Sequence, residues 1–165
     1  MRINRNDGRS FEKTLETINS QYERQGRATV SKVEPPCRVI GWGPQRKVIF
    51  LPNPYPDFLG VWTELGSRPL FFEAKSTSEP RLANDKSHLS DNQLEAMRRW
   101  RTAGAATFLL WEMAGVVTFW TMAMIEAGLS ARRSLVFEDG HQVESGTGFV
   151  FHDYLATARR FKDYL

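Results

Sequence analysis

The sequence predicts an α/β fold in which a mixed central β-sheet is flanked by helices. Helical and extended patterns follow one another in the order helix, strands, hairpin, helix, strands, which is typical of this class. The chain has 165 residues, of which 41% are hydrophobic, and this is enough for one sizeable core. We therefore expect a single domain over residues 1–165, with its core at about 6–125 and an extension at about 126–165.

The N-terminal part is expected to hold one helix and several short strands. A helix is predicted over residues 8–25, because apolar residues recur there at helical spacing. They are Phe11, Leu15, Ile18 and Tyr22. Strands are expected at 28–33, 39–40 and 48–51. The segment 52–56 is rich in proline, which cannot donate to a β-ladder, so it is expected to be irregular.

A β-hairpin is predicted next, with strands at 58–62 and 70–75. Side chains alternate between the two faces of a strand, so Glu73 and Lys75 point the same way. The hairpin brings Asp57, which precedes its first strand, back beside Glu73. Two carboxylates and one ammonium are therefore expected to meet at one end of the sheet.

The remaining elements follow from local patterns. Residues 76–88 are predicted to be a polar loop. A helix is expected to begin at Ser90, because Ser90 and Gln93 match the capping-box pattern. The other expected elements are strands at 105–111 and 116–120, a short helix near 122–127 and a last helix from about Asp153. The stretch 130–150 has no clear pattern.

The expected cluster of Asp57, Glu73 and Lys75 has the composition of a metal site for phosphodiester hydrolysis. Mg²⁺ prefers hard oxygen ligands and keeps several waters, so one or two carboxylates and a substrate phosphate suffice. Such an ion polarises the phosphoryl oxygen and acidifies water. Lys75 is then expected to orient that water or to offset charge on the phosphate. The alternative is a solvated strand face with a weak ion pair, because a Glu-x-Lys triplet arises about 0.6 times by chance in such a chain.

Charge and cysteine content restrict the partners and the compartment. The formal net charge is +3, the pI is about 9.2 and several arginines occur in clusters. Arginine matches phosphate geometry, so a nucleic-acid partner is compatible with the sequence, and solvated surface is the alternative for each cluster. The sequence has no membrane-length apolar run, and the single cysteine, Cys37, excludes an internal disulfide. We expect a cytoplasmic protein, associated with the nucleoid, or one in the host cytoplasm if its source is a phage.

An ordered series of motifs runs through roughly residues 5–120. It comprises Asn6-Asp7-Gly8-Arg9-Ser10-Phe11-Glu12, Asn19-x-x-Tyr22, Gly26-x-Ala28, Lys32-x-x-Pro35-Pro36, Asp57-Phe58-Leu59-Gly60-Val61, Phe72-Glu73-Ala74-Lys75-Ser76-Thr77, His88-Leu89 with Gln93, and Thr102-Ala103-Gly104-Ala105-Ala106. In this order the motifs resemble those of the RecU-type Holliday junction resolvases, within the PD-(D/E)xK nuclease superfamily. The resemblance implies a single nuclease domain with a restriction-endonuclease-like core.

The resemblance also implies roles for five residues. Asp57 and Glu73 would bind the divalent metal, Mg²⁺ or Mn²⁺, and Lys75 would assist catalysis. Glu12 matches an acidic residue of the family that helps to hold the metal or its waters, and a surface carboxylate is its alternative. Gln93 matches a glutamine near the active site, and its alternative role is to cap its own helix.

Basic residues and a stalk are the expected contacts with DNA. The basic candidates are Arg5, Arg9, Lys32, Arg46, Lys47 and Arg98. In the family a stalk projects into the centre of the junction, and here it would arise between Arg38 and Pro56, where the stretch is short. The segment 53–56 also replaces a Ser/Thr-rich run of the family.

The expected function is a Mg²⁺-dependent, structure-selective endonuclease that resolves four-way DNA junctions by paired symmetric nicks. A two-fold substrate needs two symmetric cuts, which a homodimer supplies. One alternative is another nuclease of the superfamily, restriction-like or nicking, that acts on duplex DNA. The other is a DNA-binding recombination accessory without catalytic activity.

Overall fold

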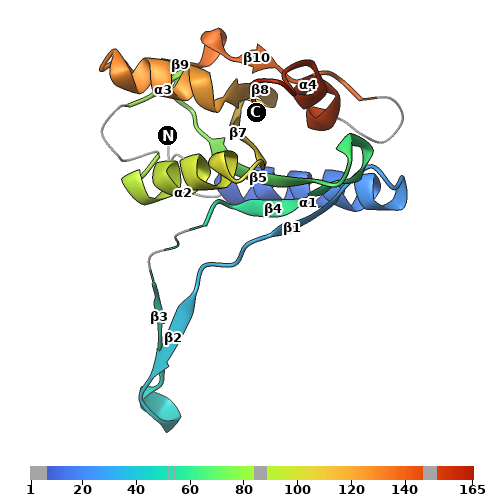
Figure 1. Cartoon of the computed structure of the whole chain (residues 1–165). Helices are drawn as coiled ribbons and strands as arrows, with labels where there is room; N and C mark the ends of the chain where they lie inside the picture. The colour runs from blue at the N-terminus through green and yellow to red at the C-terminus, as the bar shows by residue number, and fades with distance from the viewer. Residues whose placement is uncertain (1–6, 52, 54, 84–88, 147–151) are drawn as a thin grey trace.

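A six-stranded mixed sheet with helices on both faces forms the body of the chain (Figure 1). The computed structural model describes residues 7–51, 53, 55–83, 89–146 and 152–165, and side chains from Ser10 onward. The strands, in spatial order, are β1 (Thr29–Lys32), β4 (Phe58–Trp62), β5 (Arg68–Ser76), β7 (Ala106–Met113), β8 (Val116–Thr121) and β10 (His141–Gln142). β5 and β7 pair in parallel and the other neighbours pair antiparallel, so the predicted fold class is confirmed.

Four helices of the described residues cover the sheet. They are α1 (Asp7–Arg24), α2 (Asp91–Thr102), α3 (Met122–Ser130) and α4 (Tyr154–Arg160). α1 and α4 contribute to the core on one face, and α2 and α3 to the core on the other. α2 lies between β5 and β7 in the chain, because two parallel neighbours need a crossover rather than a tight turn.

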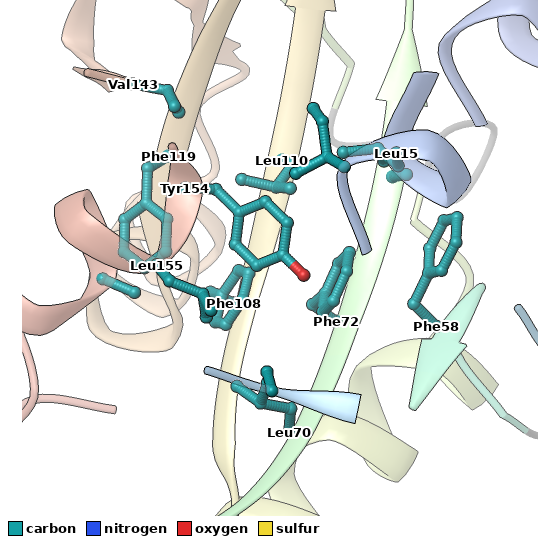
Figure 2. Close-up of a cluster of buried hydrophobic side chains, with 14 of the residues drawn as sticks. Leu15, Phe58, Leu70, Phe72, Phe108, Leu110, Phe119, Val143, Tyr154 and Leu155 are labelled. Atoms are coloured by element: carbon teal, nitrogen blue, oxygen red, sulfur yellow. The ribbon is translucent and has the colours of Figure 1, made fainter. Parts of the chain in front are cut away.

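Strand register explains the larger core (Figure 2). Phe58, Phe72 and Phe108 are opposite one another on β4, β5 and β7. Their rings stack with centroids 5.0 Å and 4.8 Å apart, beneath Leu15 of α1 and Tyr154 of α4. Because side chains alternate along β5, the residues next to Phe72 face α2 instead. This alternation puts Glu73 on the α2 side of the sheet.

A two-stranded hairpin projects away from this body (Figure 1). It consists of β2 (Cys37–Ile40), the 3₁₀ turn η1 (Gly43–Gln45) and β3 (Lys47–Phe50). Every residue of it is exposed, including Trp42 at its tip, of which 94% is accessible. The short stretch expected where the family has a stalk is thus a hairpin with strands of four residues each.

The structure contains short elements that the sequence did not predict. The expected polar loop at 76–88 contains a strand, β6 (Arg81–Leu82), because Leu82 is buried against β9 (Leu135–Val136). The unassigned stretch 130–150 holds β9, the 3₁₀ turn η3 (Phe137–Asp139) and β10. A third 3₁₀ turn, η2 (Thr63–Leu65), joins β4 to β5.

Helices α2 and α4 begin where the sequence predicts. Ser90 caps α2 in a capping box with Gln93, as expected. Asp153 caps α4, and its side chain accepts a hydrogen bond from the backbone N–H of Ala156. In the described part of the chain, every helix is too short or too polar to cross a membrane.

Candidate active site

The register of β4 and β5 brings the two predicted carboxylates together. Phe58 pairs with Phe72, so Asp57 and Glu73 are the next positions to face each other. The Asp57 carboxylate accepts a hydrogen bond from the backbone N–H of Ala74 at 3.0 Å. The Asp57 carbonyl accepts another from the N–H of Val33 at 2.8 Å, which ties it to the end of β1. Backbone pairing thus holds Asp57 beside Glu73.

Glu73 is completely buried, yet only one of its oxygens has a partner. Its Oε1 accepts hydrogen bonds from Lys75 Nζ and from Gln93 Nε2. Its Oε2 is buried and contacts no donor in the described parts of the chain. A buried carboxylate oxygen without a donor is costly, so it marks a place where a cation fits.

The charges at this site do not balance. Burial raises the pKa of the Glu73 carboxyl to about 8; Lys75 opposes the rise and Asp57 adds to it. Burial lowers the pKa of Lys75, but the carboxylates of Glu73, Asp57 and Glu12 outweigh it and raise that pKa overall. Lys75 therefore stays an ammonium, but its charge alone does not offset the effect of burial and of Asp57 on the pKa of Glu73.

Gln93 has both of the roles that the sequence left open. Its side-chain Oε1 accepts hydrogen bonds from the backbone N–H and the hydroxyl of Ser90, each at 3.0 Å, and so completes the cap of α2. Its Nε2 donates to Glu73 from the other end of the same amide. The start of α2 is therefore attached directly to the buried carboxylate.

A cleft of about 620 Å³ opens at the site, where the hairpin joins the body. Glu12 of α1, Lys32 of β1 and Asp57 line it, together with Phe50 and Asn53. Lys32 Nζ lies 3.0 Å from Glu12 Oε2. The lysine that the sequence suggests as a phosphate contact is thus paired with a candidate catalytic carboxylate at the edge of the cleft.

Three other basic candidates, Arg46, Lys47 and Arg98, do not line this cleft. Arg46 and Lys47 are exposed on the projecting hairpin. Arg98 pairs with Glu126 at 3.0 Å on the outer side of α2. Arg5 and the side chain of Arg9 lie outside the described residues, as does His88.

The donor set suits a hard divalent cation. Asp57 and Glu73 supply carboxylate oxygens, and the free Oε2 of Glu73 is the position such an ion would satisfy. Within the residues that the structure describes, no group of three or more His, Cys, Asp or Glu is placed to hold a metal. An ion at this site would therefore take its remaining ligands from water or substrate, as Mg²⁺ commonly does.

Comparison with known proteins places the chain in a family. The family described as Recombination protein U, RecU, matches residues 6–129. The chain belongs to the RecU family. All five candidate catalytic residues of this RecU chain lie inside the matched range, and the resemblance noted from the motifs is confirmed.

The chain is also similar to solved structures. The chain is similar to Hjc, a Holliday junction resolvase from the archaeal hyperthermophile Archaeoglobus fulgidus, with a TM-score of 0.44 and 18% identity. That match covers 70% of this chain and 73% of Hjc. A comparison with curated protein sequences finds no significant match.

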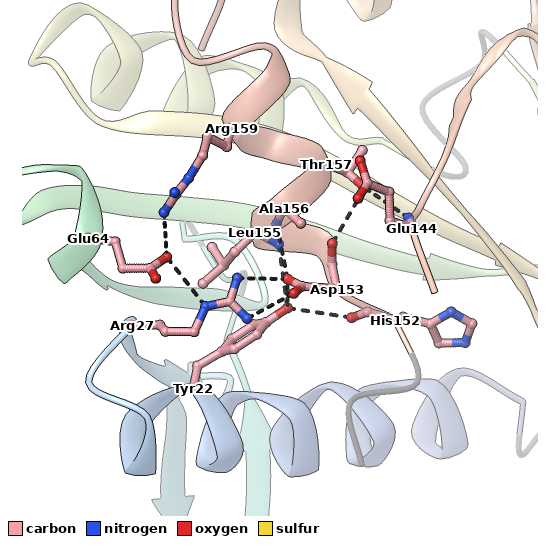
Figure 3. A network of polar contacts seen from close by, with 10 residues as sticks. All are labelled: Tyr22, Arg27, Glu64, Glu144, His152, Asp153, Leu155, Ala156, Thr157 and Arg159. Carbon is pink, nitrogen blue, oxygen red and sulfur yellow. Dashed lines mark hydrogen bonds and ion pairs between the residues drawn. The ribbon is translucent and has the colours of Figure 1, made fainter. Parts of the chain in front are cut away.

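A second, half-buried polar cluster, which the motifs do not predict, joins α1 to α4 (Figure 3). Asp153 accepts hydrogen bonds from both terminal nitrogens of Arg27, at 2.8 Å and 3.1 Å. It also accepts from the hydroxyl of Tyr22 at 2.9 Å. Burial raises the pKa of Asp153, but these donors, with the N–H of Ala156, outweigh burial and lower it. Arg27 and Asp153 are 126 positions apart, and no local signal connects them.

Proposed function

We propose that this RecU-family chain is a metal-dependent endonuclease that resolves four-way DNA junctions. The observation that carries the proposal is the buried Glu73 Oε2, which has no donor among the residues that the structure describes and lies beside a second carboxylate. A purely structural carboxylate at this depth would have its oxygens hydrogen-bonded. Membership of a family of recombination proteins makes branched DNA the favoured substrate.

Asp57 and Glu73 would hold Mg²⁺ or Mn²⁺ between them. When bound, such an ion supplies Lewis acidity toward the scissile phosphate and lowers the pKa of water. It would also add the positive charge that this site lacks. The ionised form of Glu73 would then be favoured, although burial alone raises its pKa to about 8.

The chain's own residues orient the reacting groups. Lys75, held as an ammonium, offsets negative charge that develops on the phosphate or orients the attacking water. Gln93 fixes the direction of the Glu73 carboxylate, because its amide is itself held by Ser90. Glu12 lines the same cleft as Asp57 and would bind waters around the ion.

The projecting hairpin would carry the first contacts with DNA. Arg38, Arg46 and Lys47 are exposed on it, and Trp42 presents a flat apolar ring at its tip. Basic side chains bind the phosphate backbone, and an aromatic ring stacks on exposed bases. Arg5, Arg9, Lys32 and Arg98 remain proposed contacts of the body. A homodimer would supply two symmetric active sites for the two cuts.

Mapping nicks on a mobile four-way junction, with and without Mg²⁺, tests the proposal. A linear duplex of the same sequence is the matched substrate. We expect paired nicks in the junction that depend on the metal, and little cutting of the duplex. Equal cutting of both substrates would favour a duplex nuclease. Binding of the junction without any cutting would favour the recombination accessory.

A further inference from the structure

A second pocket, of about 570 Å³, lies next to the proposed active site at the end of β5. Thr14 of α1, Ser76 of β5, Glu112 of β7 and His152 are among the residues that line it. Ser76 directly follows Lys75, and consecutive Cα atoms are about 3.8 Å apart. Because side chains alternate along a strand, Ser76 points to the face opposite Lys75. A DNA strand that crosses this edge of the sheet can reach both positions.

The polar groups of this pocket are mainly acceptors. Ser76 Oγ donates to Glu112 Oε2 at 2.6 Å, and the N–H of Gly115 donates to Glu112 Oε1 at 2.6 Å. Thr14 Oγ1 donates to the carbonyl of Ser10 at 3.1 Å. The hydroxyls of Ser76 and Thr14 have thus used their protons and offer lone pairs only, as the Glu112 carboxylate does. A ligand that brings donors would find these three acceptors together.

The described part of the lining does not favour an anion. Among the described residues around the pocket there is no lysine or arginine, whereas Glu112 supplies a carboxylate. Phe11 and Met113 supply apolar surface, and the imidazole of His152 turns away from the cluster around Asp153 (Figure 3). Apolar walls with a few acceptors, in a volume typical of small-ligand sites, suit a flat heterocycle with an amino group.

We propose that this pocket, which we call the base pocket, receives a nucleobase from the DNA strand held at Asp57 and Glu73. It would favour a base with an exocyclic amino group, as adenine, cytosine and guanine have and thymine lacks. The inference rests on the proposed nuclease function and names a source of its sequence preference. Enzymes that read an extruded base recognise its edge by hydrogen bonds and its faces by packing, and the base pocket offers both.

Single-turnover cleavage of junctions that differ only in the bases flanking the nicked bond tests the proposal. We expect thymine at one of these positions to slow cleavage about tenfold. Glu112→Gln should remove most of this preference, because an amide donates as well as accepts. Thr14→Val, which removes one acceptor and keeps the shape, should reduce it.

Thr17→Val is the matched control for the threonine. Thr17 Oγ1 donates to the carbonyl of Lys13 at 3.0 Å, the same bond that Thr14 makes nearly one turn earlier, but Thr17 does not line the base pocket. The Thr17→Val variant should leave the base preference unchanged. Equal cleavage rates for all four bases at every position in the wild type, or an unchanged preference in Glu112→Gln and Thr14→Val, would overturn the proposal.

A binding measurement separates this inference from the proposed function. Junctions with 2-aminopurine beside the expected cleavage position are bound to the Asp57→Asn variant, which should not cut. Fluorescence should rise at one position as the probe leaves the base stack, and adding Glu112→Gln should reduce the rise at least threefold. A wild type that cuts no DNA would refute the nuclease function, whereas the base pocket would be refuted by fluorescence that stays unchanged at every probe position.

Discussion

Two carboxylates of this molecule, the buried Glu73 and the half-buried Asp153, differ in how completely they are satisfied. Asp153, whose side chain is 16% exposed, accepts from Arg27, Tyr22 and the N–H of Ala156. Glu73, with a side chain that is 0% exposed, has an oxygen that contacts no donor in the described residues. The pKa of Asp153 is lowered, and that of Glu73 is raised to about 8.

The difference teaches how a structural carboxylate can be told from a functional one. At Asp153 a bidentate guanidinium balances the charge, so the group stabilises the packing of α4 on α1. At Glu73 a single ammonium faces two carboxylates, and one oxygen remains available. Such a site is costly for folding alone and suited to a cation from solution.

The largest expected effect is on catalysis at the unbalanced site. Asp57→Asn should slow single-turnover cleavage about 10³-fold, or about 4 kcal/mol, because a neutral amide is a poor metal ligand. Junction binding should persist, since the amide oxygen can still accept from Ala74. Asp139→Asn, an exposed change on η3, is the control and should cut normally. Comparable cutting by Asp57→Asn and wild type would remove the proposed metal role.

The next largest effect is on folding at the balanced site. Asp153→Asn should lower the free energy of unfolding by about 3 kcal/mol, because Arg27 loses its bidentate charged partner and keeps only the ion pair with Glu64. Glu73→Gln, measured without divalent cations, should be nearly neutral or stabilising, since it replaces a carboxyl whose ionisation burial already disfavours by a neutral amide. Urea unfolding of both variants measures the contrast. Equal losses at the two positions would show that their burial, not their pairing, determines stability.

Acidity should affect the two sites in opposite directions. Glu73 has a raised pKa, so its contribution to stability is complete below about 4.5 and is lost as pH rises toward about 8. Asp153 has a lowered pKa, so its contribution is present above about 3.8 and is lost as the solution becomes more acidic. The free energy of unfolding, measured from pH 4 to 9 in the presence of a chelator, should fall less steeply with pH in Glu73→Gln than in the wild type. Parallel curves for wild type and variant would contradict the raised pKa.

A smaller effect is expected when a divalent cation is added. At ten times its dissociation constant, Mg²⁺ should stabilise the protein by about 1.4 kcal/mol, which is about 4 °C in melting temperature for a chain of this size. Calorimetry should detect this shift in wild type and in Asp153→Asn. The shift should be absent in Asp57→Asn and Glu73→Gln, and its persistence there would place the cation elsewhere.

The smallest effect is expected at the exposed border of the Asp153 cluster. Arg159 donates to Glu64 at 2.6 Å, but 52% of its side chain is exposed. Arg159→Ala should therefore cost about 0.5 kcal/mol or less. A loss as large as that of Asp153→Asn would mean that the whole cluster acts as one unit, which a double-mutant cycle would measure.

Local patterns predicted the parts of the molecule that are close in sequence. The approach of Asp57 to Glu73 follows from one hairpin, and the contact of Ser90 with Gln93 from one turn of helix. The pairing of Arg27 with Asp153 and the free oxygen of Glu73 depend on how distant elements pack, which no short pattern encodes. The strand β6 was missed because only two residues form it.

Apolar composition alone also did not indicate that the projecting hairpin is exposed to solvent. Val48, Ile49 and Phe50 have the composition of a buried strand, yet all three are exposed. A run of apolar residues predicts a strand, but only the tertiary arrangement determines whether that strand is covered.

The hairpin between Cys37 and Phe50 contributes no residue to either hydrophobic core. The length and composition of this hairpin can therefore change without unfolding the rest of the domain. Changes in its outer part, away from Phe50 at the cleft, would alter what the hairpin contacts without changing the residues around Glu73. Evolution or protein engineering can in this way change the molecule that the hairpin binds while the fold of the body stays the same.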